Sequence, residues 1–255
     1  ENETALRFQY ALNLDKLGFT GAALKQYRVI TSMKPGFTEA ENNIGLLLLR
    51  TGKLPEAAAS FQRAISLRTD HIEPRFNLAA VLDRQGKLDQ AAALYLEVLR
   101  LRPGYPRANN SLGIIRARQG RKALAGEHFR QELTLDPGFA EAHNNLGQIL
   151  LELADNKGAE ARLREAIRVD PLDSEAHMNL GIALRRLGKP ADAAKQYLEA
   201  IRLNPRFIEA ITSLGQLRMA EGKTAEAEAR FRSALQINPR FTPARVNLER
   251  LLKQK

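Results

Sequence analysis

An all-α solenoid is the fold class that this sequence predicts, on the evidence of three rows of residues that each repeat every 34 positions. The first row is glycine, with alanine at one step: Gly18, Gly52, Gly86, Gly120, Ala154, Gly188 and Gly222. The second row is alanine throughout: Ala23, Ala57, Ala91, Ala125, Ala159, Ala193 and Ala227. The third is aromatic with one leucine: Tyr27, Phe61, Tyr95, Phe129, Leu163, Tyr197 and Phe231. A unit of this size cannot bury its own apolar face, so successive units stack into a solenoid.

Two helices are expected in each unit, whose residues we number from 1 to 34 with Thr4 at position 1. Small residues at positions 8 and 20 let the two backbones approach closely, and the residues at positions 7 and 24 fill the seam between them. The glycine at position 15 ends the first helix because it tolerates a left-handed conformation. A proline at position 32, replaced once by Thr69, ends the second helix because it cannot donate the next backbone hydrogen bond.

The pattern resembles the tetratricopeptide-repeat family, whose Leu-Gly pair at positions 7 and 8 is recognisable in five units. The pairs are Ile44-Gly45, Leu112-Gly113, Leu146-Gly147, Leu180-Gly181 and Leu214-Gly215. The family's usual Trp at position 4 is absent from every unit. The resemblance implies a right-handed α-solenoid that runs through residues 1–255 as a single domain. Its seven helix-turn-helix repeats are expected at 4–37, 38–71, 72–105, 106–139, 140–173, 174–207 and 208–241.

A capping helix is expected over residues 242–255, after the last full repeat. Glu249 stands at position 8, where other repeats have Gly or Ala, and a following second helix would leave its charge stranded. The ends of a solenoid need such a polar cap. We expect Leu248 and Leu252 to face inward.

No catalytic, metal or cofactor motif is recognisable, so we expect a protein that is not an enzyme and holds no metal or cofactor. There is no Cys, no HExxH motif and no phosphate-binding loop, because Gly222-Lys223-Thr224 lacks the earlier glycine of that motif. His143 and His177 share position 4 of adjacent repeats, and we interpret them as packed or solvated imidazoles. No apolar run is long enough to span a membrane. The first residue is Glu1, so we expect a processed or excised chain, cytoplasmic or periplasmic, whose compartment stays open.

Binding residues are expected on the concave face, which the resemblance assigns to positions 2, 5, 6, 9, 12 and 13 of each first helix. Position 6 is mostly amide: Asn43, Asn77, Asn145, Asn179 and Asn247. A primary amide both donates and accepts, so such a row can hold a peptide backbone without reading its side chains. The alternative is that each Asn bonds a neighbouring helix. The row is similar to the asparagine ladder in the repeat domain of O-linked N-acetylglucosamine transferases, although no catalytic half is present here.

Two other groups of residues belong to the same expected face. Position 13 is largely basic, with Arg50, Arg84 and Arg118 as candidate contacts for an acidic partner. A base at the end of a helix also complements the helix dipole, and this explanation is an alternative. Apolar residues at positions 5 and 9 of the first three repeats, Phe8, Leu12, Leu46 and Phe76, form a candidate pocket. The alternative is that a preceding segment covers them.

The function expected from these rows is a protein-interaction scaffold that holds an extended peptide or a partner protein in its groove. A substrate-recruiting arm of a larger enzyme, such as a glycosyltransferase, is the first alternative. The net charge of +10 admits nucleic-acid binding as a second alternative. We disfavour it because the bases are spread over both helices and the aromatics occupy core positions. No small-molecule substrate is evident, and the chaperone-tail carboxylate clamp is broken at Leu46 and Ser111.

Overall fold

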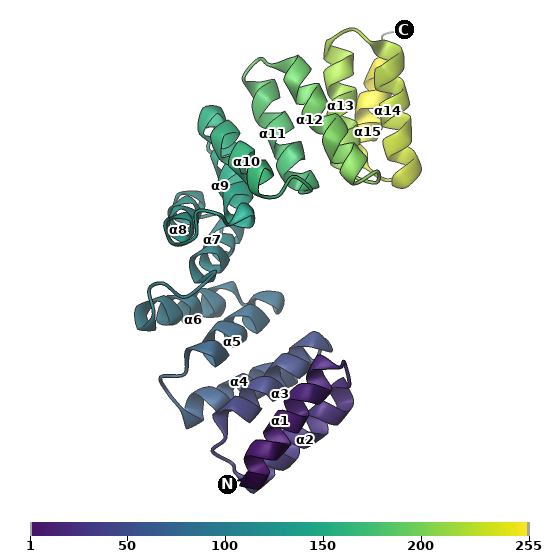
Figure 1. Cartoon of the computed structure of the whole chain (residues 1–255). Coiled ribbons are helices and arrows are strands. Elements are labelled where there is room, and N and C mark those ends of the chain that lie inside the picture. The colour runs from purple at the N-terminus through teal and green to yellow at the C-terminus, as the bar shows by residue number, and fades with distance from the viewer. Residues whose placement is uncertain (1, 254–255) are drawn as a thin grey trace. The chain divides into compact units, whose positions relative to one another are not determined.

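The computed structural model describes residues 2–253, and within this range the chain consists of helices joined by short turns, with no strand (Figure 1). The helices are α1 (Asn2–Lys16), α2 (Thr20–Met33), α3 (Thr38–Arg50), α4 (Leu54–Leu67), α5 (Ile72–Arg84), α6 (Leu88–Leu101), α7 (Ala108–Arg118), α8 (Lys122–Leu135), α9 (Ala140–Glu152), α10 (Asn156–Val169), α11 (Ser174–Arg186), α12 (Pro190–Leu203), α13 (Ile208–Ala220), α14 (Thr224–Ile237) and α15 (Thr242–Leu252). The predicted all-α fold is therefore confirmed.

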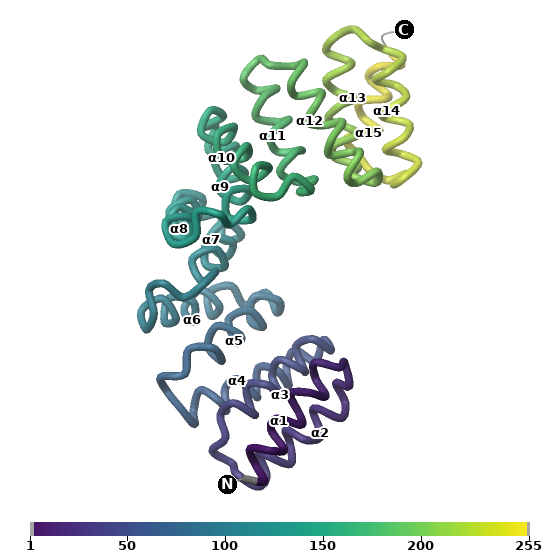
Figure 2. The backbone as a smooth tube through the Cα atoms, viewed as in Figure 1, coloured from purple at the N-terminus to yellow at the C-terminus, as the bar shows by residue number. Residues whose placement is uncertain are grey.

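The chain divides into two compact units, which we call the N-terminal unit (Glu1–Arg121) and the C-terminal unit (Lys122–Lys255). The N-terminal unit holds α1–α7 and the C-terminal unit holds α8–α15. Within each unit consecutive helices pack on one another, as the backbone trace shows (Figure 2). The boundary lies inside the predicted fourth repeat, 106–139, and the single continuous solenoid stays a prediction.

The helix ends follow the predicted period closely. Most first helices begin at position 1 and end at position 13, and the second helices run from position 17 to 30. The corner residue at position 15 is left-handed throughout, with φ between 72° and 82° at its six glycines and 63° at Ala154. The predicted role of that glycine is confirmed. Proline at position 32 is not required to end the second helix, because α4 ends at Leu67 although position 32 of that repeat is Thr69.

The core of each repeat lies between its two helices. The alanines at position 20 are fully buried, and the rings at position 24 are at most 3% exposed. Glycine at position 8 gives the ring its space, since a Cβ on Gly45 would lie 2.5 Å from Phe61 and a Cβ on Gly181 would lie 2.5 Å from Tyr197. These close approaches confirm the predicted seam.

Helix α15 packs on α14 and α13 at the C-terminal end of the described chain. The expected contact of Leu248 is confirmed, since it packs with Phe231 and Leu251. The expectation for Leu252 was wrong, because it is 46% exposed whereas Leu251 is 2% exposed. Residues 244, 248 and 251 follow the spacing of one helix face, and residue 252 lies one step beyond it. Residues 254–255 of the predicted capping helix lie outside the described residues.

Candidate functional site

The candidate binding surface consists of positions 2, 5, 6, 9, 12 and 13 of the first helices, and we call it the first-helix face. The structure places the predicted asparagines at equivalent points of it, with Asn43 on α3, Asn77 on α5, Asn145 on α9, Asn179 on α11 and Asn247 on α15. All five are half-buried. A half-buried amide can serve the scaffold and a ligand together, so the bonds that each one makes decide what remains for a ligand.

One kind of bond joins position 6 to a tyrosine at position 24 of the preceding repeat. Asn43 Nδ2 donates to the Tyr27 hydroxyl oxygen at 3.2 Å. Burial raises the pKa of Tyr95 to about 12, and its hydrogen bond with Ser111 opposes that rise. Burial likewise raises the pKa of Tyr27, against the bond with Asn43. Both phenols are therefore neutral and form hydrogen bonds within the scaffold at ordinary pH.

Another kind of bond joins position 6 to an asparagine at position 5 of the preceding first helix. Asn77 Nδ2 donates to Asn42 Oδ1 at 3.1 Å, and Asn179 Nδ2 donates to Asn144 Oδ1 at 3.0 Å. In these repeats position 24 holds Phe61 or Leu163, which has no polar atom to offer. At these four junctions between repeats, the residue at position 6 bonds a tyrosine hydroxyl where one is present and a position-5 amide where it is not.

The last two junctions between repeats in the C-terminal unit depart from this rule. The Tyr197 hydroxyl and Thr212 Oγ1 are buried, and neither has a hydrogen-bond partner in residues 2–253. Burial raises the pKa of Tyr197, and the nearby Arg185 guanidinium counters part of that rise. The two groups do not have the geometry of a hydrogen bond. Asn247 Nδ2 donates instead to the Pro243 carbonyl within its own helix, at 2.7 Å.

The asparagine row thus has a structural role at several of its members, as the alternative in the sequence analysis expected. Each of these bonds uses one amide hydrogen of the position-6 residue, and the amide has a second hydrogen and a carbonyl oxygen with two lone pairs. Position 6 therefore keeps donor and acceptor capacity.

The predicted arginines differ in their availability. Arg50 forms an ion pair with Asp15, and Arg118 forms one with Asp83, in each case with the residue 35 positions earlier. Arg186 uses the same spacing to donate to the Leu151 carbonyl at 2.6 Å. Arg84 is exposed and, among the described residues, has no acidic group within 4 Å. The preceding position 12 is Leu49, which explains why Arg84 lacks a partner there.

The predicted apolar residues gather around aromatic contacts in the N-terminal unit. The Phe8 ring centroid lies 5.6 Å from that of Tyr27 and 5.1 Å from that of Phe37. Phe76 repeats the arrangement, at 5.3 Å from Tyr95 and 5.2 Å from Tyr105. Leu12 is half-buried against the same core, and Leu46 is 40% exposed. Aromatic rings at position 34 were absent from the sequence-based site.

A pocket of about 560 Å³ opens beside Phe8. Its lining comes from α1, the last residue of α2 and the turn that follows: Thr4, Ala5, Phe8, Gln9, Met33, Lys34 and Phe37. The Lys34 ammonium lies over the Phe37 ring, 5.6 Å from its centroid. Sequence reasoning missed Lys34, although a row at position 31 with the same 34-residue period could have revealed it. The candidate surface therefore includes the turn as well as the first helix.

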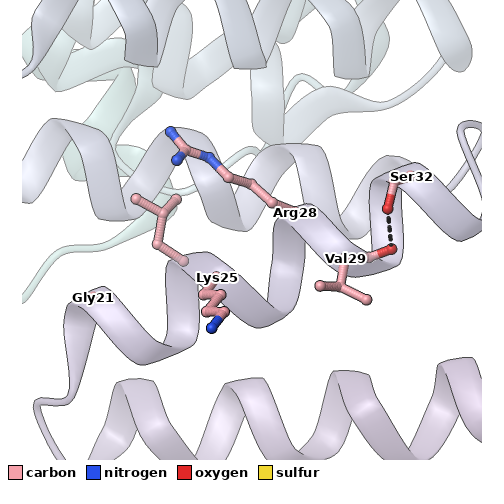
Figure 3. Close-up of a pocket in the computed structure, with 6 residues that line it drawn as sticks. Gly21, Lys25, Arg28, Val29 and Ser32 are labelled. Atoms are coloured by element: carbon pink, nitrogen blue, oxygen red, sulfur yellow. Dashed lines mark hydrogen bonds between the residues drawn. The ribbon is translucent and has the colours of Figure 1, made fainter.

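A second hollow, of about 370 Å³, runs along α2 alone (Figure 3). Lys25 and Arg28 stand at its sides, and the Ser32 hydroxyl donates back to the Val29 carbonyl at 2.8 Å. Because one helix supplies the whole lining, no second element closes it, and it brings no residues together for chemistry.

The two histidines are held by the turn before their helix. His143 Nε2 lies 3.0 Å from the Pro137 carbonyl oxygen, and His177 Nε2 lies 3.2 Å from that of Pro171. Over residues 2–253 no three His, Cys, Asp or Glu side chains gather as they would around a metal ion. The same residues include no helix with the length and apolarity needed to cross a membrane.

Comparison with solved structures finds helical repeat proteins. A chain of the APC/C hetero-tetramer Cut9-Hcn1 is 19% identical, with a TM-score of 0.76 over 95% of this chain and 48% of that one. A tetratricopeptide repeat protein from Parabacteroides merdae is 17% identical, with a TM-score of 0.71 over 99% and 100%. YrrB, described as a TPR protein with an unusual peptide-binding site, is 22% identical, with a TM-score of 0.63 over 75% and 99%. These identities show the fold alone.

The comparisons also bear on the family. No curated protein matches the chain. The chain spans 48% of the length of its Cut9-Hcn1 neighbour. One family model described as a tetratricopeptide repeat matches residues 76–140 and 144–206, and a second with the same description matches 37–104. The chain belongs to the tetratricopeptide-repeat family.

Proposed function

We propose that this chain is a non-catalytic interaction module that holds an extended peptide, or an extended segment of a partner protein, along its first-helix face. Proteins of this family bind protein or peptide partners, and YrrB is described as having a peptide-binding site. The observation that carries the proposal is the half-buried amide at position 6, which recurs on successive first helices and retains hydrogen-bonding capacity beyond its scaffold bond.

The spacing of the amides suits a peptide backbone. Packed helices lie roughly 8–10 Å apart, and an extended chain advances about 3.3 Å per residue, so each amide would meet roughly every third residue of the ligand. A single-stranded nucleic acid would stack its bases on exposed aromatic rings. The rings at position 24 are buried, and Phe8 and Phe76 are half-buried against other aromatic rings. A recruiting arm of a larger enzyme would use the same surface, and the full reading frame would reveal any catalytic segment.

Asn144 and Asn179, which join two neighbouring repeats, provide a test with its own control. Asn144→Ala and Asn179→Ala each remove the same bond between Asn179 and Asn144, so both should destabilise the fold by a similar 0.5–1.5 kcal/mol, roughly. Asn144 is only 6% exposed, whereas Asn179 is half-buried at position 6. We therefore expect Asn179→Ala alone to weaken peptide binding, by roughly twofold to tenfold.

The ligands for this test are peptides selected from a random library displayed on phage with the wild-type chain as bait. Isothermal titration would measure their affinities, and chemical unfolding would measure the stability of each variant. Equal affinities for Asn144→Ala and Asn179→Ala would show that the amide row serves the scaffold only. Failure to select any peptide would count against the proposal as a whole.

A further inference from the structure

The turn that leads from a second helix into the next repeat has one backbone conformation in both units. In all seven turns the N–H at position 34 donates to the carbonyl at position 31, as Phe37 does to Lys34 at 3.0 Å and Phe207 to Asn204 at 3.0 Å. The residue at position 31 is extended in each unit, with φ −147° and ψ 93° at Arg102 and φ −130° and ψ 91° at Asn204. The residue at position 31 therefore adopts the same backbone conformation in both units.

The side chains at position 31 nevertheless fall into two classes. In the C-terminal unit they are Asp136, Asp170, Asn204 and Asn238, and each accepts a hydrogen bond from the N–H two residues later, at 3.0–3.1 Å. In the N-terminal unit they are Lys34, Arg68 and Arg102, which we call the turn cations. Lysine and arginine have no acceptor, so these three turns forgo a bond that stabilises the others.

The scaffold itself does not require the turn cations. Lys34 lies over the Phe37 ring and Arg102 over the Tyr105 ring, at 5.6 and 5.8 Å from the centroids. Phe207 and Phe241 occupy the same position 34 in the C-terminal unit, after an asparagine and not a cation. A turn with an aromatic at position 34 therefore forms the same backbone hydrogen bond without a base at position 31. Residues that forgo a local backbone hydrogen bond made in the other repeats are candidates for function.

The turn cations lie beside the apolar part of the candidate surface. Lys34 and Phe37 line the same pocket as Phe8 and Gln9, which are first-helix residues at positions 5 and 6. Arg102 stands in the same relation to Tyr105, whose ring packs on Phe76, the next phenylalanine at position 5. The N-terminal unit thus has two clusters of the same kind, two repeats apart, each with two half-buried aromatic rings and one exposed cation.

The charge of the N-terminal unit is consistent with an anionic ligand. Residues 1–121 contain 18 Lys or Arg and 11 Asp or Glu, a formal charge of +7, whereas residues 122–255 contain 21 and 18, a formal charge of +3. Arg68, the middle turn cation, is already engaged by Glu39 and Asp70. Lys34 and Arg102 are the cations that remain for a ligand, one at each cluster.

We propose that the N-terminal unit selects an acidic extended peptide that carries two apolar side chains, one for each cluster, with Lys34 and Arg102 contacting its carboxylates. Two repeat steps are roughly 16–20 Å, which an extended chain crosses in about five or six residues. The inference rests on the proposed function, since it names the kind of peptide that the same surface holds.

The test uses two synthetic peptides, each with two phenylalanines separated by about five residues. One has glutamate at the intervening positions and the other has glutamine. The wild-type chain should bind the glutamate peptide more tightly, and added salt should reduce the preference. The double variant Lys34→Asp and Arg102→Asp should lose roughly fivefold to tenfold in affinity for the glutamate peptide and should lose the preference.

This variant separates binding from folding, because aspartate at position 31 restores the side-chain acceptor found in the C-terminal unit. Its melting temperature should be unchanged or higher. The matched control, Asp136→Lys and Asn204→Lys, should bind the glutamate peptide no less tightly than the wild type and melt lower. The inference is overturned if the wild type binds both peptides equally, if neither peptide binds, or if the double variant keeps the preference. Equal binding of both would leave the proposed function standing, because that function is judged with library-selected peptides.

Discussion

The N-terminal and C-terminal units share one backbone pattern but use their loop side chains differently. In the C-terminal unit an Asp or Asn side chain accepts a backbone hydrogen bond in each turn at position 31. Asp155 and Asp173 also cap α10 and α11, whereas the residues that cap α9 and α12–α15 make no side-chain cap bond. In the N-terminal unit the residues that cap α2–α7 make no side-chain cap bond, and position 31 is basic. Because the backbone of the turns is alike, the two units differ at position 31 in the side chain alone, which is a hydrogen-bond acceptor in one unit and a base in the other.

The largest expected effect concerns position 8, where two repeats of the N-terminal unit have alanine in place of glycine. Ala79 sits beneath Tyr95 in the N-terminal unit, whereas Gly181 sits beneath Tyr197 in the C-terminal unit. A Cβ on Gly181 would lie 2.5 Å from the ring of Tyr197, so Gly181→Ala should cost about 1–3 kcal/mol of stability by overpacking. Urea unfolding measures this cost. A gain in stability would show that the seam can relax and that helix propensity dominates.

The next comparison concerns the tyrosine hydroxyls of the two units. Tyr27 accepts a bond from Asn43, so Tyr27→Phe should cost roughly 0.5–1.5 kcal/mol. The Tyr197 hydroxyl is buried without a partner in the described residues, so Tyr197→Phe should be neutral or stabilising. Thermal unfolding of both variants, with circular dichroism to confirm helix content, would decide. Equal losses would mean that the Tyr197 hydroxyl is bonded in solution.

The smallest expected effect concerns the corners between paired helices. All four corners of the N-terminal unit are glycine, whereas the C-terminal unit has one alanine, Ala154, at φ 63°. A left-handed alanine is strained, so Ala154→Gly should raise the stability by about 0.5–1 kcal/mol. Gly86→Ala, at φ 75°, should lower it by a similar amount. If Ala154→Gly were destabilising, the flexibility that glycine adds to the unfolded chain would outweigh the relief of strain.

Much of the fold could be predicted because its signals are local or strictly periodic. The left-handed corners followed from a row of glycines, and the close helix approach followed from glycine opposite an aromatic ring. Leu252 was predicted wrongly because one step along a helix changes the face, and the sequence does not show which step the core selects. The single-domain prediction stays open.

The bonds of the candidate site were harder to predict because they join different repeats, most of them between residues 35 positions apart. The partner of Asn77 depends on reading positions 5 and 24 of the preceding repeat together, since Asn42 supplies the acceptor where Phe61 cannot. The pairing of Arg50 with Asp15 likewise needs the preceding position 12. A comparison of the residues at a single repeat position reveals neither of these two pairings. The candidate contacts at positions 6 and 13 remain predictions for ligand binding.

The amide at position 6 also bears on how such an array can change its length. Asparagine both donates and accepts, so it can follow a repeat that presents a hydroxyl, as Asn43 does, or one that presents an amide, as Asn77 does. Loss of residues 38–71 by recombination would bring Asn77 opposite Tyr27, which is a combination that the chain already uses. An ancestral array could therefore gain or lose a repeat with asparagine at position 6 and still form a hydrogen bond between the repeats that become neighbours.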